Sequence, residues 1–258
     1  MNATQILLEL LRSGQQPGGE VVQRALRSPS SPPEFFTLLS GCHWAIRDRR
    51  LVSLAVGHPK CPRHLALQLV HHLGWHDLLQ VARWPRAPAP VRRQVERRLL
   101  ERLPMLTLGE RTSLARLAPR SVIFGMLADQ SLRVIQALLG NPQCTEIVPV
   151  RVLALHPSAE VVLTVLRHPK WGLLPAVRLA AVRSRQTPLA VAFGLLATFA
   201  DPTLHNLSEN LDLSESLRVA ARALRARRVG DRDQGLRKTQ SGSTPLASAV
   251  SPPKLEGQ

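Results

Sequence analysis

A short phrase built on proline recurs along this chain of 258 residues and constrains its fold more than any other feature. The phrase is a Pro, then a small residue two positions later, then Pro or Thr, and a run rich in Leu and Val follows it. Clear copies stand at 29–32, 59–62 and 85–88, and weaker copies at 142–145, 157–160 and 186–188. Pro ends the helix before it, and a second Pro or a Thr favours the start of the next helix. The recurrence predicts an array of paired short helices, one pair every 26 to 30 residues.

The amino-acid composition favours helices for the core. Hydrophobic residues make up 44% of the chain but aromatic residues only 3%, so the core must consist of Leu, Val and Ala. Such a core suits helices that pack on helices better than a β-sandwich, which favours β-branched and aromatic residues. No stretch alternates apolar and polar residues long enough to indicate a sheet. We therefore expect an all-α protein, an α-solenoid of paired short helices.

The helix expected after Pro88 shows the clearest apolar stripe. Val91, Val95, Leu99 and Leu103 recur at every fourth residue, which places them on one face of a helix. Arginines occupy the rest of its circumference. The stripe predicts a surface helix with one face in the core.

The chain divides by composition into three parts: an N-terminal helical cap at 1–27, a helical repeat domain at 28–228, and a tail at 229–258. The cap contains two helices joined by a Gly- and Pro-containing turn at 14–19. The tail is rich in Ser, Gly and Pro and cannot bury enough apolar surface to order itself, so we expect it to be disordered. The apolar run 189–200 predicts a buried helix. The stretch 104–124 does not fit the register of the repeat.

This pattern resembles the leucine-rich-repeat-variant and HEAT-like families of bacteria. The segments that carry the resemblance, over roughly residues 28–228, are 141–145, 156–162 and 185–189. The resemblance implies a helical repeat array that serves as a binding scaffold. Some relatives hold an iron–sulfur cluster on four clustered N-terminal cysteines, which this chain lacks, so the cluster is not carried over and we expect no cofactor.

The charge of the chain points to anionic partners. The formal net charge is +16, carried by 30 Arg and 4 Lys, although a GC-rich genome also encodes such a composition. Two arginine groups are the candidate binding residues: Arg92, Arg93, Arg97 and Arg98 in one helix, and Arg218, Arg222 and Arg225 in a basic helix at 217–228. The apolar side expected of the second helix consists of Val219, Ala220, Ala223 and Leu224. In the first group Glu96 and Glu101 can pair with arginines, which favours an ordinary solvated face. We expect weak, non-specific binding of nucleic acid at most.

The cysteines and the N-terminus indicate a cytoplasmic protein. Cys42, Cys61 and Cys144 are an odd number at irregular spacing, which argues against a disulfide framework and for a reducing compartment. The first residues carry Glu9 and no basic n-region, so they predict an amphipathic helix rather than a signal peptide. No apolar run is long enough for a transmembrane segment. The sequence leaves the oligomeric state open.

The histidines between 58 and 76 resemble a metal site only superficially. His72 and His76 have the i, i+4 spacing of zinc ligands on one helix face, but Leu73 stands where a His-Glu-x-x-His motif has Glu. The histidines that precede a Pro belong instead to the recurring turns: His58, His156 and His168. We expect no metal site.

Catalytic motifs are absent from the sequence. It contains no Gly-x-Ser-x-Gly and no Gly-rich phosphate loop. Trp75, Asp77 and Trp84 are the residue types with which HEAT-like DNA glycosylases hold a damaged base, but no motif of that family matches. The function we expect is a non-catalytic scaffold that binds a protein partner. The alternative is a nucleic-acid-binding HEAT-like protein, including one that resembles a DNA glycosylase.

Overall fold

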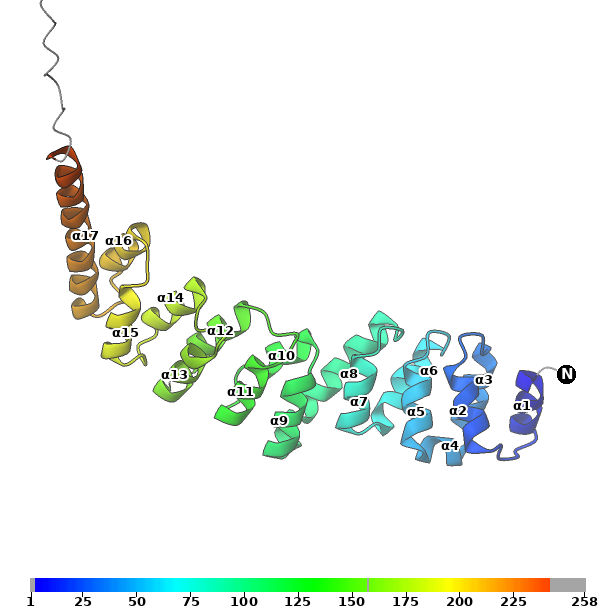
Figure 1. Ribbon diagram of the computed structural model, residues 1–258. Helices are drawn as coiled ribbons and strands as arrows, with labels where there is room; N and C mark the ends of the chain where they lie inside the picture. The colour runs from blue at the N-terminus through cyan, green and yellow to red at the C-terminus, as the bar shows by residue number, and fades with distance from the viewer. Residues whose placement is uncertain (1–2, 157, 242–258) are drawn as a thin grey trace, which may run out of the picture. The chain divides into compact units, whose positions relative to one another are not determined.

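The computed structural model describes residues 3–156 and 158–241. Within these ranges the chain forms seventeen α-helices, two short 3-10 helices and no β-strand, so the predicted all-α class is confirmed (Figure 1). In chain order the elements are α1 (Ala3–Arg12), α2 (Gly19–Arg27), α3 (Pro33–Gly41), α4 (His43–Arg47), α5 (Arg49–Val56), α6 (Arg63–Leu69), η1 (Val70–His72), α7 (Trp75–Ala82), α8 (Ala89–Arg102), η2 (Leu103–Met105), α9 (Leu108–Leu117), α10 (Arg120–Met126), α11 (Leu132–Leu139), α12 (Ile147–Leu155), α13 (Ala159–Arg167), α14 (Pro175–Arg183), α15 (Leu189–Leu196), α16 (Asp201–Glu209) and α17 (Glu215–Ser241).

The helices fall into two compact units, Met1–Gln186 and Thr187–Gln258. In the first unit, helices that are not adjacent in sequence contact one another in two series. One series runs α2, α5, α7, α9, α11 and α13, each helix in contact with the next. The other runs α1, α3, α6, α8 and α10, and α12 contacts α14 in the same way further along. The first unit is thus two layers of short helices with the core between them (Figure 1).

The proline phrase forms the same turn at its three clear copies and at 142–145. At four sites the small residue donates its backbone N–H to the carbonyl of the residue before the Pro, at 2.9 to 3.3 Å: Ser31 to Ser28, Cys61 to His58, Ala87 to Trp84 and Cys144 to Asn141. This hydrogen bond closes a β-turn with Pro at its second position, where Pro is favoured. All four small residues are buried, which explains their size. The weaker phrase at 157–160 differs, because Ala159 is exposed, and Pro157 lies outside the described residues.

The residue before the turn proline also reaches back to the preceding helices. The Nε2 atom of His58 lies 3.0 Å from the carbonyl oxygen of Ser28, and the Nδ1 atom accepts the N–H of Lys60. The Nε2 atom of His156 lies 2.6 Å from the carbonyl oxygen of Leu127. These contacts span 29 or 30 residues and show that both histidines have structural partners.

Asn141 occupies the same place in its turn and makes three hydrogen bonds. Its amide donates to the carbonyl oxygens of Ala115 and Ala118 at 2.7 and 3.0 Å, and its Oδ1 accepts the N–H of Gln143 at 2.7 Å. The Ala115 carbonyl has no helical partner, because the residue four positions on is Pro119, which lacks an N–H. Asn141 therefore donates the hydrogen bond that the Ala115 carbonyl, near the end of α9, cannot receive from position 119.

The predicted stripe of α8 is confirmed for its first three residues, whereas Leu103 lies after the helix, in η2, and is half-buried. Val91, Val95 and Leu99 are at most 2% exposed, and the arginines between them lie at the surface or are half-buried. Helix α8 contacts α6, α7 and α10, so its apolar face lies in the core of the first unit.

The stretch 104–124, which the sequence pattern left unassigned, is helical. Thr107 caps the N-terminus of α9: its hydroxyl accepts the N–H of Glu110, and the Glu110 carboxylate accepts the N–H of Thr107. This Thr-x-x-Glu capping box was visible in the sequence as a helix start. Pro104 stands three residues before Thr107, which is the spacing of the recurring phrase, but Leu106 occupies the place of the small residue, so the phrase is incomplete here.

The second unit consists of α15, α16 and α17, with α17 in contact with both of the others. Two predictions for this unit are wrong in detail. Helix α15 is only partly buried, because Leu189 and Phe193 are 52% and 39% exposed. The buried residues of α17 include Leu217 and Ala221 rather than Val219, which is 50% exposed, so the core face is offset from the predicted one.

The C-terminal boundary also differs from the prediction. Helix α17 continues to Ser241, past residue 228 where we expected helix to give way to a disordered tail. Arg and Ala residues with high helix propensity extend it to 228, and no Pro interrupts it before 241. The rest of the predicted tail, 242–258, lies outside the described residues.

Candidate functional site

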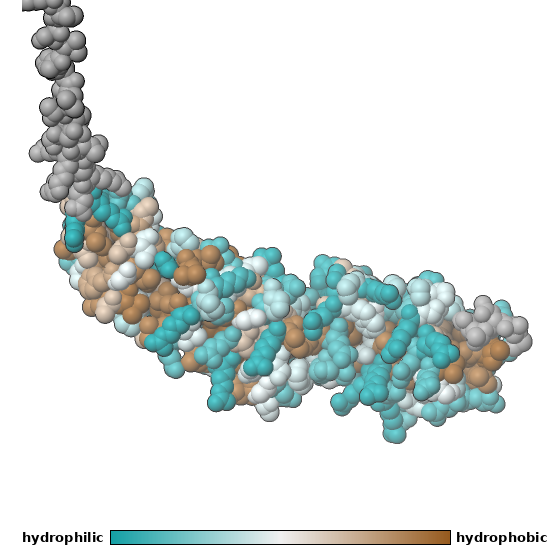
Figure 2. Space-filling model, viewed as in Figure 1, coloured by the Kyte–Doolittle hydropathy of each residue, from teal (hydrophilic) through white to brown (hydrophobic). Residues whose placement is uncertain are grey.

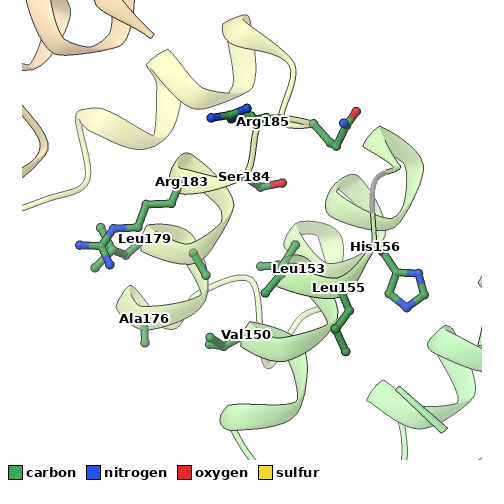
Figure 3. A pocket seen from close by; sticks show the side chains of 12 residues that line it. Val150, Leu153, Leu155, His156, Ala176, Leu179, Arg183, Ser184 and Arg185 are labelled. Carbon is green, nitrogen blue, oxygen red and sulfur yellow. The ribbon is translucent and has the colours of Figure 1, made fainter. Parts of the chain in front are cut away.

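The candidate site is a groove in the first unit, lined by α12, α14 and the residues that follow each helix. It has a volume of about 600 Å³ and is open to solvent (Figure 3). Its lining residues are Val150, Leu153, Ala154, Leu155, His156, Ala176, Leu179, Ala180, Arg183, Ser184, Arg185 and Gln186. The lining is mostly aliphatic, holds two arginines and contains no carboxylate.

The aliphatic part of this groove reaches the surface. Leu155 is 54% exposed at the end of α12, although the same helix buries Val148, Val152 and Leu153. Figure 2 shows apolar surface over α12 and α14 between hydrophilic side chains. Leu155 thus presents a large apolar side chain to water beside other apolar residues, a common property of interaction sites.

Among the polar residues of the groove, His156 already contacts another residue of the chain, whereas the two arginines are exposed. The His156 ring points away from α14, toward the Leu127 carbonyl that it contacts (Figure 3). Arg183 extends on the opposite side of the groove and is exposed (Figure 3). Arg183 and Arg185 can therefore meet a negatively charged group, whereas His156 is already occupied.

The first predicted arginine group lies elsewhere. Arg92, Arg93, Arg97 and Arg98 are on α8, and none of them lines the α12–α14 groove. Arg93 and Arg97 are exposed, while Arg98 pairs with Glu101 at 2.9 Å on the same helix. The arginine–glutamate pairing on this helix is thus present at Arg98.

The second predicted group, on α17, is engaged within its own unit. Arg218 pairs with Glu215 at 2.8 Å, and Arg222 donates to the carbonyl of Ser208 at 3.2 Å. The Nη1 atom of Arg225 lies 3.0 Å from Nδ1 of His205. The Arg222 and Arg225 contacts join α17 to α16, whereas the Arg218 pair lies within α17. All three arginines thus already have a partner within this unit.

The histidine pair that resembles a zinc motif does not share a helix. His72 ends η1, Leu73 is extended, and α7 begins at Trp75, so the i, i+4 spacing of His72 and His76 crosses a helix break. The described residues contain no group of three or more His, Cys, Asp or Glu side chains placed to hold a metal ion.

The tryptophans that suggested a base-binding cleft have local partners. The indole N–H of Trp75 donates to Glu110 at 2.9 Å, and Asp77 accepts the N–H of Gly74 at the start of α7. The Trp84 ring lies against Gly57, where an added Cβ would come within 2.6 Å of the ring. Trp84 therefore acts as a packing wedge that requires glycine at position 57.

The cysteines have the properties of structural residues. Burial raises the pKa of Cys61 to about 12 and that of Cys144 to about 11. Both thiols donate to the carbonyl of the next residue. At neutral pH they are protonated and poor nucleophiles.

Sequence reasoning missed the α12–α14 groove. The only signal in the sequence is that α12 is apolar around most of its circumference, which alone would indicate a helix buried on all sides.

Within the described part of the chain no helix is long and apolar enough to cross a membrane. Comparisons of the chain with protein-family models, with characterised proteins and with solved structures find no match.

Proposed function

We propose that this protein is a non-catalytic scaffold, an α-solenoid of HEAT-like or leucine-rich-repeat-variant type that binds a protein partner in the cytoplasm. The recurring proline turn and the two layers of short helices in the first unit support the solenoid. Stacked helix pairs of this kind provide extended surfaces for binding.

The observation that carries the proposal is the α12–α14 groove. Its aliphatic lining would be covered by an apolar partner segment, and its two arginines would pair with an acidic residue of that segment. The character of the lining supports binding over chemistry: Ser184 is its only hydroxyl, and the His156 Nε2 that could serve as a base is in contact with Leu127.

The test compares two charge substitutions at exposed apolar residues. Leu155→Glu places a carboxylate in the groove, and Met105→Glu places one at a residue that is 86% exposed and outside it. Immobilised protein is incubated with extract of its native cells, and captured proteins are quantified by mass spectrometry. We expect a specific partner that binds the wild type and the Met105→Glu variant but is lost with Leu155→Glu. Equal capture by both variants would refute the groove as the binding site.

A further inference from the structure

A second concave surface in the first unit carries arginines that have no partner. Two neighbouring hollows, of about 340 and 440 Å³, lie along α7, α9 and α11. The first is lined by Ala82, Arg83, Arg116, Leu117, Pro119, Asn141, Pro142 and Gln143, and the second by Thr112, Arg116, Arg133, Gln136, Ala137 and Gly140. Arg116 lines both hollows, and we refer to the two together as the arginine groove.

The arginine groove is positively charged because nearby carboxylates are used elsewhere. Glu110 accepts hydrogen bonds from Thr107 and Trp75. Asp129 pairs with Arg111 at 3.2 Å and caps Ser131. No aspartate or glutamate lines either hollow.

The three groove arginines are therefore available. Arg83, Arg116 and Arg133 are exposed, and within the described part of the chain none of their side chains forms a hydrogen bond or an ion pair. Arg83 directly follows α7, Arg116 lies on α9 and Arg133 on α11, and these are three successive helices of one layer.

We propose that the arginine groove binds an extended acidic peptide segment of a partner protein. This inference rests on the proposed scaffold function and names the chemistry of one partner. Arginine binds carboxylate through two parallel hydrogen bonds, the strongest such pairing among side chains. An extended segment can present acidic residues along such a groove, since residues three apart in a polyproline-type segment lie on one face.

The lining favours a peptide over nucleic acid. Neither hollow contains an aromatic side chain on which a base could stack. Leu117, Ala137 and Pro142 also line the hollows, and the apolar parts of peptide side chains can cover these residues. The hollows have room for individual side chains and not for a duplex.

The test uses a short fluorescent peptide that repeats Glu-Pro-Ala, with a Gln-Pro-Ala peptide as the neutral probe, measured by fluorescence polarisation on the full chain. We expect binding of the acidic peptide only, and a loss of affinity of about tenfold or more in Arg116→Ala, since a charge-assisted hydrogen bond contributes about 1.5–3 kcal/mol. Arg63→Ala is the matched control, because it removes the same charge from an exposed site on α6 that lines neither hollow. Melting temperatures establish that both variants are folded.

Three results would overturn the inference. The first is no difference in binding between the two peptides. The second is an equal loss in Arg116→Ala and Arg63→Ala, which would mean that net charge alone attracts the peptide. The third is tighter binding of a single- or double-stranded DNA probe than of the peptide, with the DNA affinity reduced in Arg116→Ala. The capture experiment with Leu155→Glu is independent of these results. If the wild type captures a partner that Leu155→Glu does not, the scaffold function stands and only the acidic-peptide site is refuted.

Discussion

Replacement of Asn141 with alanine is expected to destabilise the first unit by about 3 kcal/mol. The Asn141 side chain is 4% exposed and makes three hydrogen bonds of 2.7 to 3.0 Å. A buried hydrogen bond contributes about 1 kcal/mol net, and an acceptor left unpaired adds a desolvation cost. The Ala115 carbonyl has no alternative partner in its helix because Pro119 lacks an N–H, so this acceptor bears that cost.

A histidine at the same position provides the matched variant. In the equivalent turn, His58 reaches back to a carbonyl through Nε2 and accepts a backbone N–H through Nδ1. Asn141→His can therefore restore two of the three hydrogen bonds, and we expect it to recover about 2 kcal/mol of the loss.

Urea unfolding at neutral pH, followed by far-ultraviolet circular dichroism, measures both variants against the wild type. Hydrogen exchange of the α9 and α11 amides locates the change, which should be concentrated in those helices. Equal urea midpoints for Asn141→Ala and wild type would refute the role of this residue. If Asn141→His unfolded as easily as Asn141→Ala, the equivalence of the two turns would be wrong.

Three further predictions concern the core, a buried histidine and the second unit. Leu99→Ala should lower the free energy of unfolding by about 2–5 kcal/mol, because Leu99 is fully buried, and an unchanged urea midpoint would contradict this. Burial lowers the pKa of His58, so the folded state resists protonation of this ring. The free energy of unfolding should therefore decrease as the pH falls below about 6.5, the pKa of histidine in the unfolded chain. His58→Asn should make the free energy of unfolding depend less on pH in this range. Truncation after Arg228 should leave the second unit folded, whereas truncation after Ser216 removes Leu217 and Ala221 from its core and should lower its melting temperature; equal melting of the two would mean that α17 does not stabilise the unit.

Local signals in the sequence predicted the secondary structure of much of this protein. The proline phrase predicted turns at 28–31 and 58–61, because proline fixes its own backbone angle and restricts the residue before it. The period of Val91, Val95 and Leu99 predicted the buried face of α8, because burial follows the helical repeat. Both signals act over a few residues and need no knowledge of the rest of the chain.

The candidate binding surfaces depended on contacts between distant residues. Arg98 and Arg116 both lie near the end of a helix. In the structure Arg98 pairs with Glu101, whereas Arg116 lines an open groove. The arginines of α17 read as free cations in the sequence, but packing against α16 brings Ser208 within reach of Arg222. The sequence by itself determined the all-α class, the recurring turns and the excess of arginine. Only the tertiary structure decided which arginines are free and which apolar faces stay open, because both depend on neighbours from other helices.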